Sequence, residues 1–499
     1  MPLQMLCSED SELAAIPYAL PAAKKVLFVT SELKGLLKAG GLGEISSYLP
    51  HMLRRQGLDA RILIPGYRAI LEKYPELRPM TVLPGLAEIP HCAIAKLQTE
   101  DGLLLYIVMC DELYNREGSP YGDANGQEWG DNDLRFARLG LAAEQIVAGN
   151  ADLRWKPDVV HVNDWPSAMA PAYMAWRGTN TPSIMTVHNL AYQGLFERHR
   201  CRTLGIPDAA FQTDGVEFHG KMSFLKAGLF YASHLTTVSP TYAREILTQE
   251  RGCGLDGLLR TRAERGQLTG ILNGIDDSYD PQSDPHLQHH FGRHDLAGKQ
   301  SNATDVRDAF RLTNTTGPLF ALVSRLVHQK GVDLVVDAAH EILQAGGALV
   351  ATGQGEPHLE AAMKQLAAQH PGSVGVRIGF DETIARRMYA GSDFLLMPSR
   401  FEPCGLSQMY AQRFGSLPIA HKTGGLADTI QDNVTGFLFD KPSAANLCRT
   451  IRRAVRAFAG GRVLDRMKDA AMKRPSGWAD AASDYRAVYE RAFAMTGTV

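Results

Sequence analysis

The chain is poor in cysteine and has no long apolar run. Seven cysteines occur among 499 residues, and no two form a Cys-x-x-Cys pair. The low, odd number argues against a disulfide framework or a zinc site, so we expect a reducing compartment, the cytoplasm. No apolar stretch approaches the roughly 18 residues of a membrane span, so no membrane partner is expected. Residues 1–23 lack the pattern of a secretory signal and are interpreted as a polar N-terminal extension.

The chain also lacks an excess of either charge. Lysine and arginine total 52, aspartate and glutamate total 54, and the formal net charge is -2. A nucleic-acid-binding protein would carry a basic patch or stripe, so no nucleic acid partner is expected. Hydrophobic residues make up 45% and charged residues 21%, which excludes a disordered chain and a coiled coil. At roughly 150 residues per domain, this length predicts two to four domains.

Short apolar, β-branched runs alternate with segments of helical period along the chain. This alternation predicts an α/β protein with parallel sheets, in two Rossmann-like, doubly wound lobes that face each other across a cleft. We expect an N-terminal lobe over residues 24–276, a linker and irregular segment over 277–316 and a C-terminal lobe over 317–477. A helical tail over 478–499 is expected to return to the first lobe. The expected strands are 24–30, 60–67, 158–165, 182–189, 234–240 and 268–275, and then 319–325, 348–355, 374–380, 393–399 and 417–421.

Ligands of such sheets bind outside the carboxyl ends of the strands, so the residues that follow strands carry the functional signal. The turn Lys38-Ala-Gly40-Gly41-Leu42-Gly43 separates a strand from a helix. Glycines let a backbone approach a ligand, and Lys38 adds a charge suited to phosphate. An ordinary glycine-rich turn with a solvated lysine is the alternative.

Two cations follow a strand of the second lobe. Arg325 ends the strand, and Lys330 precedes the next helix. Placed together, they would stabilise the charge that develops on a leaving diphosphate. Solvated surface charges are the alternative.

Two further turns of the second lobe run from a strand into a helix. The first is Glu402-Pro-Cys404-Gly405-Leu406, and the second is Thr423-Gly-Gly-Leu. The helix-start amides could bind phosphate, and Glu402 could bind sugar hydroxyls. Glu402 could instead only complement a helix dipole. We interpret Cys404 as structural because no base partner is evident.

Polar residues also end two strands of the first lobe, and they are suited to binding a sugar by hydrogen bonds and stacking. These residues are His161, Asn163, Asp164, Trp165, His188 and Asn189, and buried structural histidines are the alternative. Asp131 and Asp133 resemble a metal-binding Asp-x-Asp pair, but they precede a helix, so an N-cap role is simpler and no metal site is expected.

Taken together, these segments resemble the bacterial glycogen synthase and plant starch synthase family. The resemblance runs from about Lys24 to the C-terminal tail. It is carried by KAGGLGEI, VHVNDW, TVHNLAYQG, LKAGLFYASHLTTVSPTYAREI, GILNGID, SRLVHQKGVDL, GQGEP, MPSRFEPCGLSQ and TGGLADT.

The resemblance implies a GT-B fold and transfer of glucose from ADP-glucose to the non-reducing end of an α-1,4-glucan, with retention and without a cofactor. It implies catalytic roles for His188, Arg325, Lys330 and Glu402. It implies a donor site of Lys38, Gly40, Gly41, Asn189, Gly353, Gly355, Cys404, Gly405, Leu406 and Thr423. It places Glu32, Asp164 and Trp165 at the acceptor or sugar.

The chain departs from the family pattern at Ala39, Glu44, Pro166 and Tyr279. These departures bear on the acceptor preference and on the shape of the cleft. The choice between ADP-glucose and UDP-glucose, the acceptor length and the oligomeric state stay open. Two alternatives also stay open. An α-glucan phosphorylase-like enzyme would need a lysine Schiff base with pyridoxal phosphate, and a glucan-binding protein would have lost catalysis.

Overall fold

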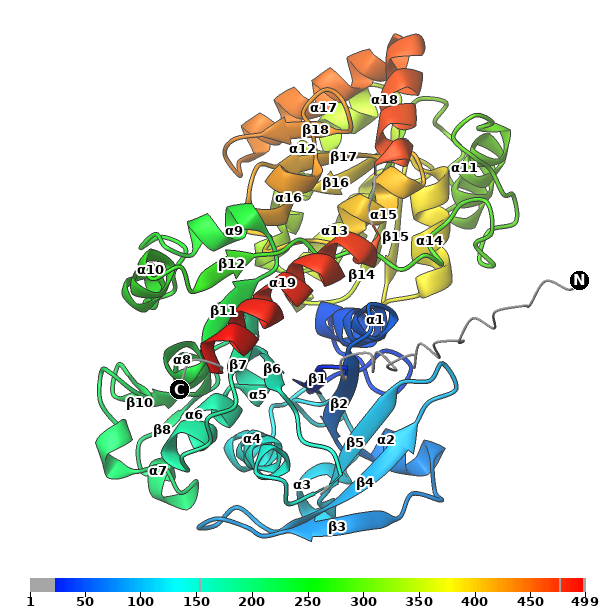
Figure 1. The fold of residues 1–499 in the computed structure, drawn as a ribbon. Helices are drawn as coiled ribbons and strands as arrows, with labels where there is room; N and C mark the ends of the chain where they lie inside the picture. Colours follow the sequence, from blue (N-terminus) through cyan, green and yellow to red (C-terminus); the bar gives the residue numbers. More distant parts are fainter. Residues whose placement is uncertain (1–22, 152–153, 475–476, 497–499) are drawn as a thin grey trace, which may run out of the picture.

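The computed structural model describes residues 23–151, 154–474 and 477–496. The predicted extension, apart from its last residue, therefore lies outside the described residues. The chain forms two α/β lobes, each built around its own mainly parallel sheet (Figure 1). The predicted fold class is confirmed.

The N-terminal lobe has a nine-stranded sheet in the order β12-β11-β7-β6-β1-β2-β5-β4-β3. Strands from β12 to β5 are parallel, and β4 and β3 add an antiparallel edge; the sequence analysis predicted none of β3, β4 and β5. The strands are β1 Lys25–Val29, β2 Asp59–Pro65, β3 Pro79–Leu83, β4 Cys92–Gln98, β5 Leu104–Met109, β6 Val159–Asn163, β7 Ser183–Val187, β11 His234–Thr237 and β12 Leu268–Gly270. A small separate sheet holds β8 Leu195–Glu197, β9 Glu217–Phe218 and β10 Lys221–Ser223.

Strand β6 shows why these segments form parallel strands. All five of its residues, Val159–Asn163, are buried, because helices cover both faces of the sheet. The helices of this lobe are α1 Gly41–Arg55, α2 Arg68–Lys73, α3 Asp111–Tyr114, α4 Asn132–Val147, α5 Asp164–Ser167, α6 Met169–Trp176, α7 Arg200–Thr203, α8 Phe224–Tyr231, α9 Pro240–Glu245 and α10 Asp256–Glu264, with a 3-10 turn, η1, at Asp208–Ala210.

The C-terminal lobe has a six-stranded parallel sheet in the order β15-β14-β13-β16-β17-β18. Its strands are β13 Leu319–Val323, β14 Ala348–Gly353, β15 Val374–Ile378, β16 Phe394–Met397, β17 Leu417–His421 and β18 Phe437–Phe439. Its helices are α12 Val332–Gln344, α13 Pro357–Gln369, α14 Glu382–Gly391, α15 Ser407–Arg413, α16 Gly424–Thr429, α17 Ala444–Ala459 and α18 Arg462–Lys473, with a 3-10 turn, η2, at His328–Lys330.

The segment 277–316 is not irregular throughout, as the sequence analysis expected. It contains α11 Ala297–Ala309, which packs against α14. Lys299 anchors this helix: its buried Nζ donates to the carbonyls of Ala390, Ser392 and Phe414 at 2.8–2.9 Å. These carbonyls lie at the C-terminal ends of α14 and α15, and burial lowers the pKa of Lys299.

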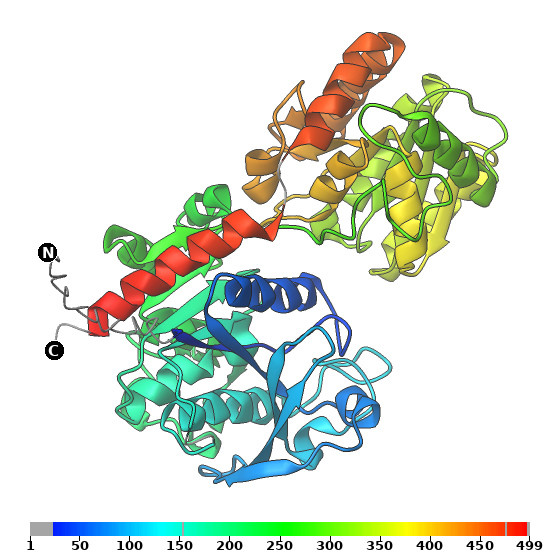
Figure 2. The same ribbon diagram turned by 45° about the vertical axis from the view of Figure 1, so that its right-hand side comes forward.

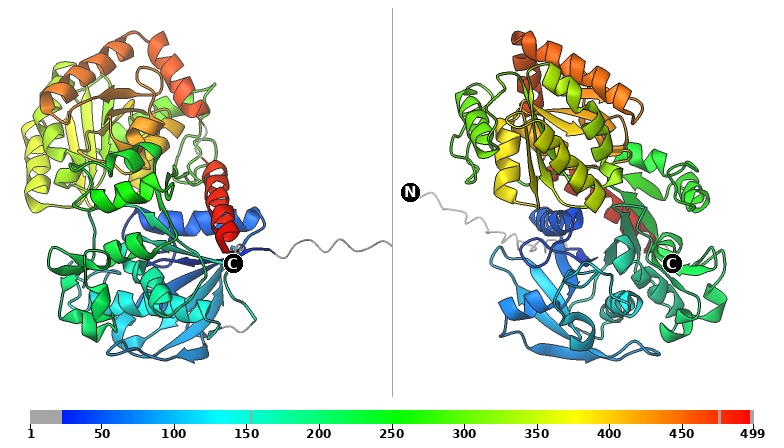
Figure 3. Two further views of the ribbon diagram at one scale, coloured as in Figure 1. Left: turned by 60° about the vertical axis from the view of Figure 1, so that its left-hand side comes forward. Right: turned by 180° about the vertical axis from the view of Figure 1, so that it is seen from behind.

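The last helix, α19 Trp478–Thr496, lies against the N-terminal lobe rather than the lobe that precedes it in sequence (Figure 2). It packs along α1, and the hydroxyl of Tyr489 lies 2.6 Å from Nδ1 of His161 on β6. Figure 3 shows from two further sides that α19 lies against the N-terminal lobe. His161 is therefore a buried structural residue that holds α19, and it is not available to a sugar.

Candidate active site

The candidate site residues lie at or just beyond the carboxyl ends of parallel strands. In the N-terminal lobe, the residues after the adjacent strands β1, β6 and β7 include Glu32, Asp164 and His188. In the C-terminal lobe, Arg325 follows β13 and Glu402 follows its neighbour β16. Adjacent parallel strands present their ends at one edge, so each group is brought together by its sheet.

Glu32 is engaged with the glycine turn. Its Oε2 accepts from the amides of Ala39 and Gly40, both at 2.8 Å, and its Oε1 accepts from Tyr121 Oη at 2.6 Å. The residue is only 3% exposed. A Cβ added at Gly40 or Gly41 would meet nothing within 4 Å, so the outer side of this turn is open. That Glu32 faces the acceptor stays a prediction.

Lys38 lies at the exposed surface, but its ammonium is paired. Its Nζ lies 2.5 Å from Oε1 of Glu44, and Nζ of Lys34 lies 3.0 Å from the other oxygen of the same carboxylate. Lys34 also reaches Asp276 at 3.2 Å. Glu44, one of the departures from the family pattern, thus binds both lysines. Lys38 would have to exchange Glu44 for a phosphate in order to contact the donor.

His188 presents a buried acceptor atom. Its Nε2 lies 3.0 Å from Asn163 Oδ1, while Asn163 Nδ2 donates to the carbonyl of Val29. Nε2 therefore carries the proton, and Nδ1, which is buried without a partner, is a free acceptor. Burial lowers the pKa of His188 to about 3, so the ring is neutral. Nδ1 is suited to accept a hydrogen bond from a hydroxyl group.

Asp164 supports the turn that carries His188. Its Oδ1 accepts from the amide of His188 at 2.7 Å and from that of Asn189 at 3.4 Å. Burial raises the pKa of Asp164 to about 7, although the hydrogen bonds from these two amides act to lower it. The residue has φ +52°, a conformation that costs energy in a residue other than glycine. Asn189 caps its own turn through Ala191, whose amide donates to Asn189 Oδ1.

Trp165 packs within an aromatic cluster. The centroid of its ring lies 4.7 Å from that of Phe136 in an edge arrangement, and 6.2 Å and 6.0 Å from those of Tyr121 and Phe196. Only part of the side chain is exposed. Trp165 therefore packs against its aromatic neighbours, and its stacking on a sugar stays a prediction.

Pro166, one of the departures from the family pattern, lies in the first turn of α5.

Lys330 and Glu402 form a shielded ion pair. Lys330 Nζ lies 2.5 Å from Glu402 Oε2, and the two side chains are 18% and 7% exposed. The hydroxyl of Ser399 donates to the same oxygen at 2.9 Å. Glu402 is therefore more than a charge at a helix end, because its carboxylate fixes the lysine that precedes α12.

Arg325 reaches across to the other lobe. Its Nη1 lies 3.2 Å from the hydroxyl of Tyr192, in the loop after β7, and its Nη2 donates to Gln329 Oε1 at 3.4 Å. The guanidinium is exposed and has no carboxylate partner among the described residues. It is available to an anionic ligand.

Gly353 and Gly355 are needed by the protein itself. A Cβ at Gly353 would lie 1.8 Å from the carbonyl oxygen of Ser324, and one at Gly355 would lie 2.3 Å from that of Leu326. These glycines let the turn after β14 press against the turn after β13 that carries Arg325. That these two glycines shape the nucleotide side of the cleft stays a prediction.

The two glycine-containing helix starts of this lobe differ. The amides of Leu406 and Ser407, at the start of α15, donate to no acceptor in the described parts of the chain. At α16 the amide of Gly424 donates to Glu245 Oε1 at 3.0 Å, and Thr423 Oγ1 donates to the same carboxylate at 2.9 Å. The carboxylate thus takes the amide of Gly424, and the amide of Gly425 donates to the carbonyl of Glu402, so a donor contact at this helix start stays a prediction.

Cys404 is buried beside the first of these turns, and Gly405 has φ +72°. Burial raises the pKa of the Cys404 thiol to about 12. The group is therefore a thiol rather than a thiolate nucleophile, as the structural interpretation predicts.

Phe380 is a candidate that the sequence analysis did not single out. It follows β15 after Gly379, whose amide donates to the carbonyl of Gly353, and it is 67% exposed. An exposed aromatic ring at a strand end is suited to stacking on a base. Its position at the end of the run VGVRIGF was the available signal.

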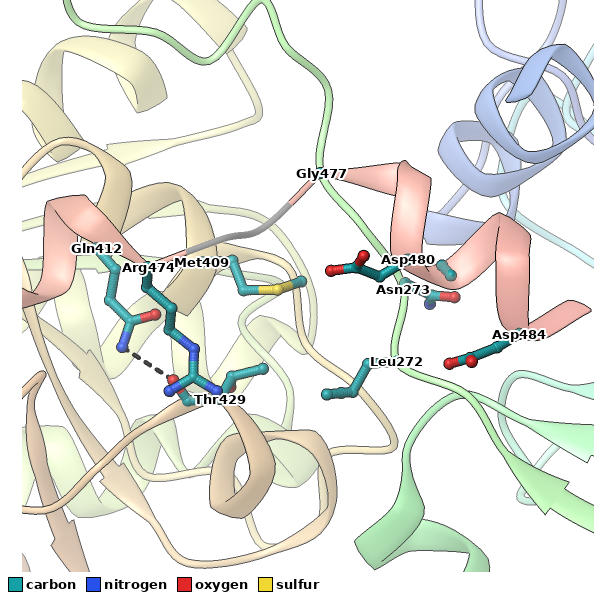
Figure 4. A pocket seen from close by; sticks show the side chains of 10 residues that line it. Leu272, Asn273, Met409, Gln412, Thr429, Arg474, Gly477, Asp480 and Asp484 are labelled. Atoms are coloured by element: carbon teal, nitrogen blue, oxygen red, sulfur yellow. Dashed lines mark hydrogen bonds between the residues drawn. The ribbon is translucent and has the colours of Figure 1, made fainter. Parts of the chain in front are cut away.

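Two cavities lie away from these residues, near the junction of the lobes. One of about 180 Å³ is lined by Leu272 and Asn273 from the N-terminal lobe, by Met409 and Gln412 from α15, and by the start of α19 (Figure 4). None of the predicted site residues lines it. The space thus belongs to the junction of the lobes.

Tyr279 lies at the same junction, in the segment that leads into the second lobe. Its ring stacks on Tyr410 of α15 with centroids 3.7 Å apart, and Arg386 lies 3.7 Å from the Tyr279 centroid. This departure from the family pattern therefore packs the linker on α15, the helix that follows the Glu402 turn.

Asp131 and Asp133 do not form a paired metal site. Asp131 occupies the N-cap position of α4 without a side-chain cap and binds Arg116 at 2.7 Å, while Asp133 binds Arg200. Asp131 thus holds the predicted N-cap position, but its carboxylate binds Arg116 instead of an amide of α4. Among the described residues, no helix has the length and apolar character to cross a membrane.

Comparisons with known proteins agree with the two-lobed fold. The family model described as starch synthase catalytic domain matches residues 25–261, and glycosyl transferases group 1 matches residues 306–473. A glycogen synthase of Pseudomonas putida is 54% identical over 470 residues, which cover 94% of this chain and 90% of that protein. Glycogen synthase 1 of Bradyrhizobium diazoefficiens is 53% identical over 459 residues, 92% of this chain and 99% of that protein.

A solved structure extends the comparison. The catalytic domain of starch synthase IV from Arabidopsis thaliana, bound to ADP and acarbose, superposes with a TM-score of 0.83 at 29% identity and covers 95% of this chain and 100% of that one. These relatives are more than 50% identical to the chain over most of both sequences, which identifies the family. The chain belongs to the glycogen synthase and starch synthase family and is a GT-B hexosyltransferase.

Proposed function

We propose that the chain transfers glucose from ADP-glucose to the non-reducing end of an α-1,4-glucan with retention of configuration. The observation that carries the proposal is the shielded pair Lys330–Glu402, at 2.5 Å, with the exposed Arg325 on the neighbouring strand end. Two cations held at one sheet edge favour a diphosphate that gains charge as it leaves. The open amides of Leu406 and Ser407 add donors for the same group. Lys38 and the open glycine turn would complete the donor site from the other lobe.

The transferred glucose would lie between the strand-end residues of the N-terminal lobe and those of the C-terminal lobe. His188 Nδ1, the free buried acceptor, would bind a sugar hydroxyl, and Asp164 would hold the His188–Asn189 turn in place. Glu402 would accept from a second hydroxyl on the side of the C-terminal lobe. Glu32 and Trp165 are the proposed contacts to the acceptor.

Retention is proposed without a covalent intermediate. Each carboxylate named here already has donors: Glu32 has three, Asp164 has two amides, and Glu402 has Lys330 and Ser399. None is a free nucleophile. The bond between the anomeric carbon and the diphosphate oxygen breaks, and the acceptor hydroxyl attacks that carbon from the same face. The proton of the hydroxyl passes to the leaving diphosphate, with Arg325 and Lys330 stabilising the charge.

The preference for adenine is proposed from Phe380. Stacking on an aromatic side chain contributes about 1–3 kcal/mol per base, and adenine offers a larger face than uracil. The ring of Phe380 is 67% exposed at the edge of the C-terminal sheet beside Gly353. The relative whose structure contains ADP agrees with this choice.

We propose a cytoplasmic location, with ADP-glucose and glucan as the partners and neither nucleic acid nor membrane. The cysteines in the described parts of the chain are unpaired, which suits a reducing compartment.

The test is a side-by-side assay of ADP-glucose and UDP-glucose with glycogen as acceptor. We expect labelled glucose to enter glycogen faster from ADP-glucose and to be released by an exo-amylase specific for α-1,4 linkages. Phe380→Ala should raise the KM for ADP-glucose more than that for UDP-glucose. Faster transfer from UDP-glucose would contradict the donor assignment, and no transfer from either donor would contradict the function.

A further inference from the structure

Both ends of helix α9, in the N-terminal lobe, form hydrogen bonds with the C-terminal lobe. At its start, the hydroxyl of Ser239 donates to the carbonyl of Pro403 at 2.6 Å. Two residues later, the amide and hydroxyl of Thr241 donate to Asp428 at 2.8 Å and 2.7 Å. At its end, Glu245 accepts from the backbone and side chain of the turn before α16. A short helix of one lobe is thus fixed to two successive turns of the other.

Glu245 binds both a side chain and a backbone amide of the C-terminal lobe. Its Oε1 accepts from Gly424 N at 3.0 Å and from Thr423 Oγ1 at 2.9 Å, and its Oε2 lies 3.2 Å from the same hydroxyl. Hydrogen bonds with an ionised partner are stronger than those between neutral groups. The carboxylate therefore fixes both the backbone and the side chain of this turn.

The turn that Glu245 holds is packed directly on the Glu402 turn. A Cβ on Gly424 would lie 2.0 Å from the carbonyl oxygen of Glu402, and one on Gly425 would lie 2.1 Å from that of Cys404. The amide of Gly425 also donates to the Glu402 carbonyl at 3.1 Å. Any shift of the glycines must move the backbone of Glu402, because no side chain lies between the two turns to absorb it.

From these contacts we propose that Glu245 is a positioning residue for glucosyl transfer, which acts across the lobes through Thr423 and Gly424 to orient Glu402. Glu402 in turn fixes Lys330. The inference rests on the proposed function, since it assigns Glu245 to the reaction through the Lys330–Glu402 pair. Glu245 itself does not contact a reacting atom.

The experiment compares Glu245→Ala with Glu245→Gln. The alanine removes every acceptor from Thr423 and Gly424, whereas the Oε1 of glutamine can still accept from the Gly424 amide. Displacement of a catalytic group by about 1 Å can cost 100-fold in rate, so we expect kcat of Glu245→Ala to fall about 10- to 100-fold. The KM for ADP-glucose should change less than kcat, and Glu245→Gln should recover most of the rate.

Thr241→Val is the matched control, because it removes a hydroxyl contact between the same helix and the same lobe but leaves Thr423 and Gly424 held. It should keep the kcat of the parent. All rates are measured well below the melting midpoint of each variant. A double-mutant cycle of Glu245→Ala with Glu402→Gln should be strongly non-additive, since both changes act on one group.

Several results would overturn the inference while leaving the proposed function intact. One is a Glu245→Ala protein that melts earlier but turns over ADP-glucose at the parent rate. Others are an equal loss of kcat in Thr241→Val, or additive effects in the cycle. Failure of the proposed function is recognised separately, because the parent protein would then transfer no glucose from ADP-glucose.

Discussion

Replacing Lys330 by methionine separates the part that its ion pair plays in stability from its part in turnover. The variant removes the cation and leaves the Glu402 carboxylate, which is 7% exposed, with Ser399 as its one remaining side-chain donor in the described parts of the chain. Removing one partner of a buried pair costs about 3–5 kcal/mol of unfolding free energy. Lys330 is 18% exposed, so water can enter beside Glu402, and we expect the lower end, about 3 kcal/mol.

Glu402→Gln should cost less stability, because the remaining lysine can reach water; about 1 kcal/mol is expected. In the double variant Lys330→Met with Glu402→Gln, no charge is left buried. Its stability should return to within about 1 kcal/mol of the parent, since a neutral replacement of a buried pair is often tolerated. Turnover should not return. Each single variant and the double variant should lose about 100- to 1000-fold in kcat, because the cation that stabilises the leaving diphosphate, or the group that orients it, is missing.

The assay combines urea unfolding with kcat for ADP-glucose, measured well below every melting midpoint. Arg325→Ala is a second probe: the side chain is exposed, so stability should change by no more than about 0.5 kcal/mol while kcat falls as steeply. Lys468→Met is the matched control, because Lys468 pairs with Asp393 at 2.9 Å in the same lobe. It should lower stability and keep turnover.

A double variant that recovered turnover together with stability would refute the reasoning, because the pair would then be structural only. Near-parent turnover in both Lys330→Met and Arg325→Ala would refute the placement of the diphosphate.

Three further predictions concern metal, pH and the last helix. Transfer from ADP-glucose should survive extensive treatment with EDTA, because cations and amides are proposed to hold the diphosphate; a loss that Mg²⁺ restores and that Asp131→Asn also causes would contradict this. Burial raises the pKa of Asp164 to about 7, so the native state keeps a proton that the unfolded chain releases near pH 4. The contribution of Asp164 to stability should therefore fall as pH rises from about 4 to 7, and urea midpoints of Asp164→Asn should lack that part of the pH dependence; parallel curves would contradict the shift. Tyr489→Phe removes the hydroxyl that lies 2.6 Å from His161 Nδ1 and should lower unfolding free energy by about 1–3 kcal/mol with kcat retained, as thermal melts and the transfer assay will test.

Local composition predicts most of the parallel strands, though not β5 or β18, and it predicts the lobe edges poorly. A strand buried on both faces, such as Val159–Asn163, must be apolar along its whole length, and that signal can be read from the sequence alone. Strand β3 has mostly exposed side chains, with Val82 62% exposed, so its sequence carries no such signal. Helix α11 has a largely polar sequence, and its place depends on the distant carbonyls that surround Lys299.

The strand-end rule also located most of the candidate site. Glycines, cations and carboxylates after apolar runs were found as motifs, because chain order alone places them at the carboxyl ends of parallel strands. Phe380 was passed over because one aromatic residue at the end of a run does not distinguish a core ring from an exposed one. Its 67% exposure is a property of the folded chain.

The partners of each polar group, by contrast, were decided by the tertiary structure. Lys38 binds Glu44, Lys330 binds Glu402 across 72 residues, and Glu245 binds Thr423 across 178 residues. A sequence pattern fixes backbone conformation over a few residues, where propensity and burial act. The partner of a charge depends on which surfaces the two lobes bring within about 3 Å, and that distance is set by the packing of the whole chain.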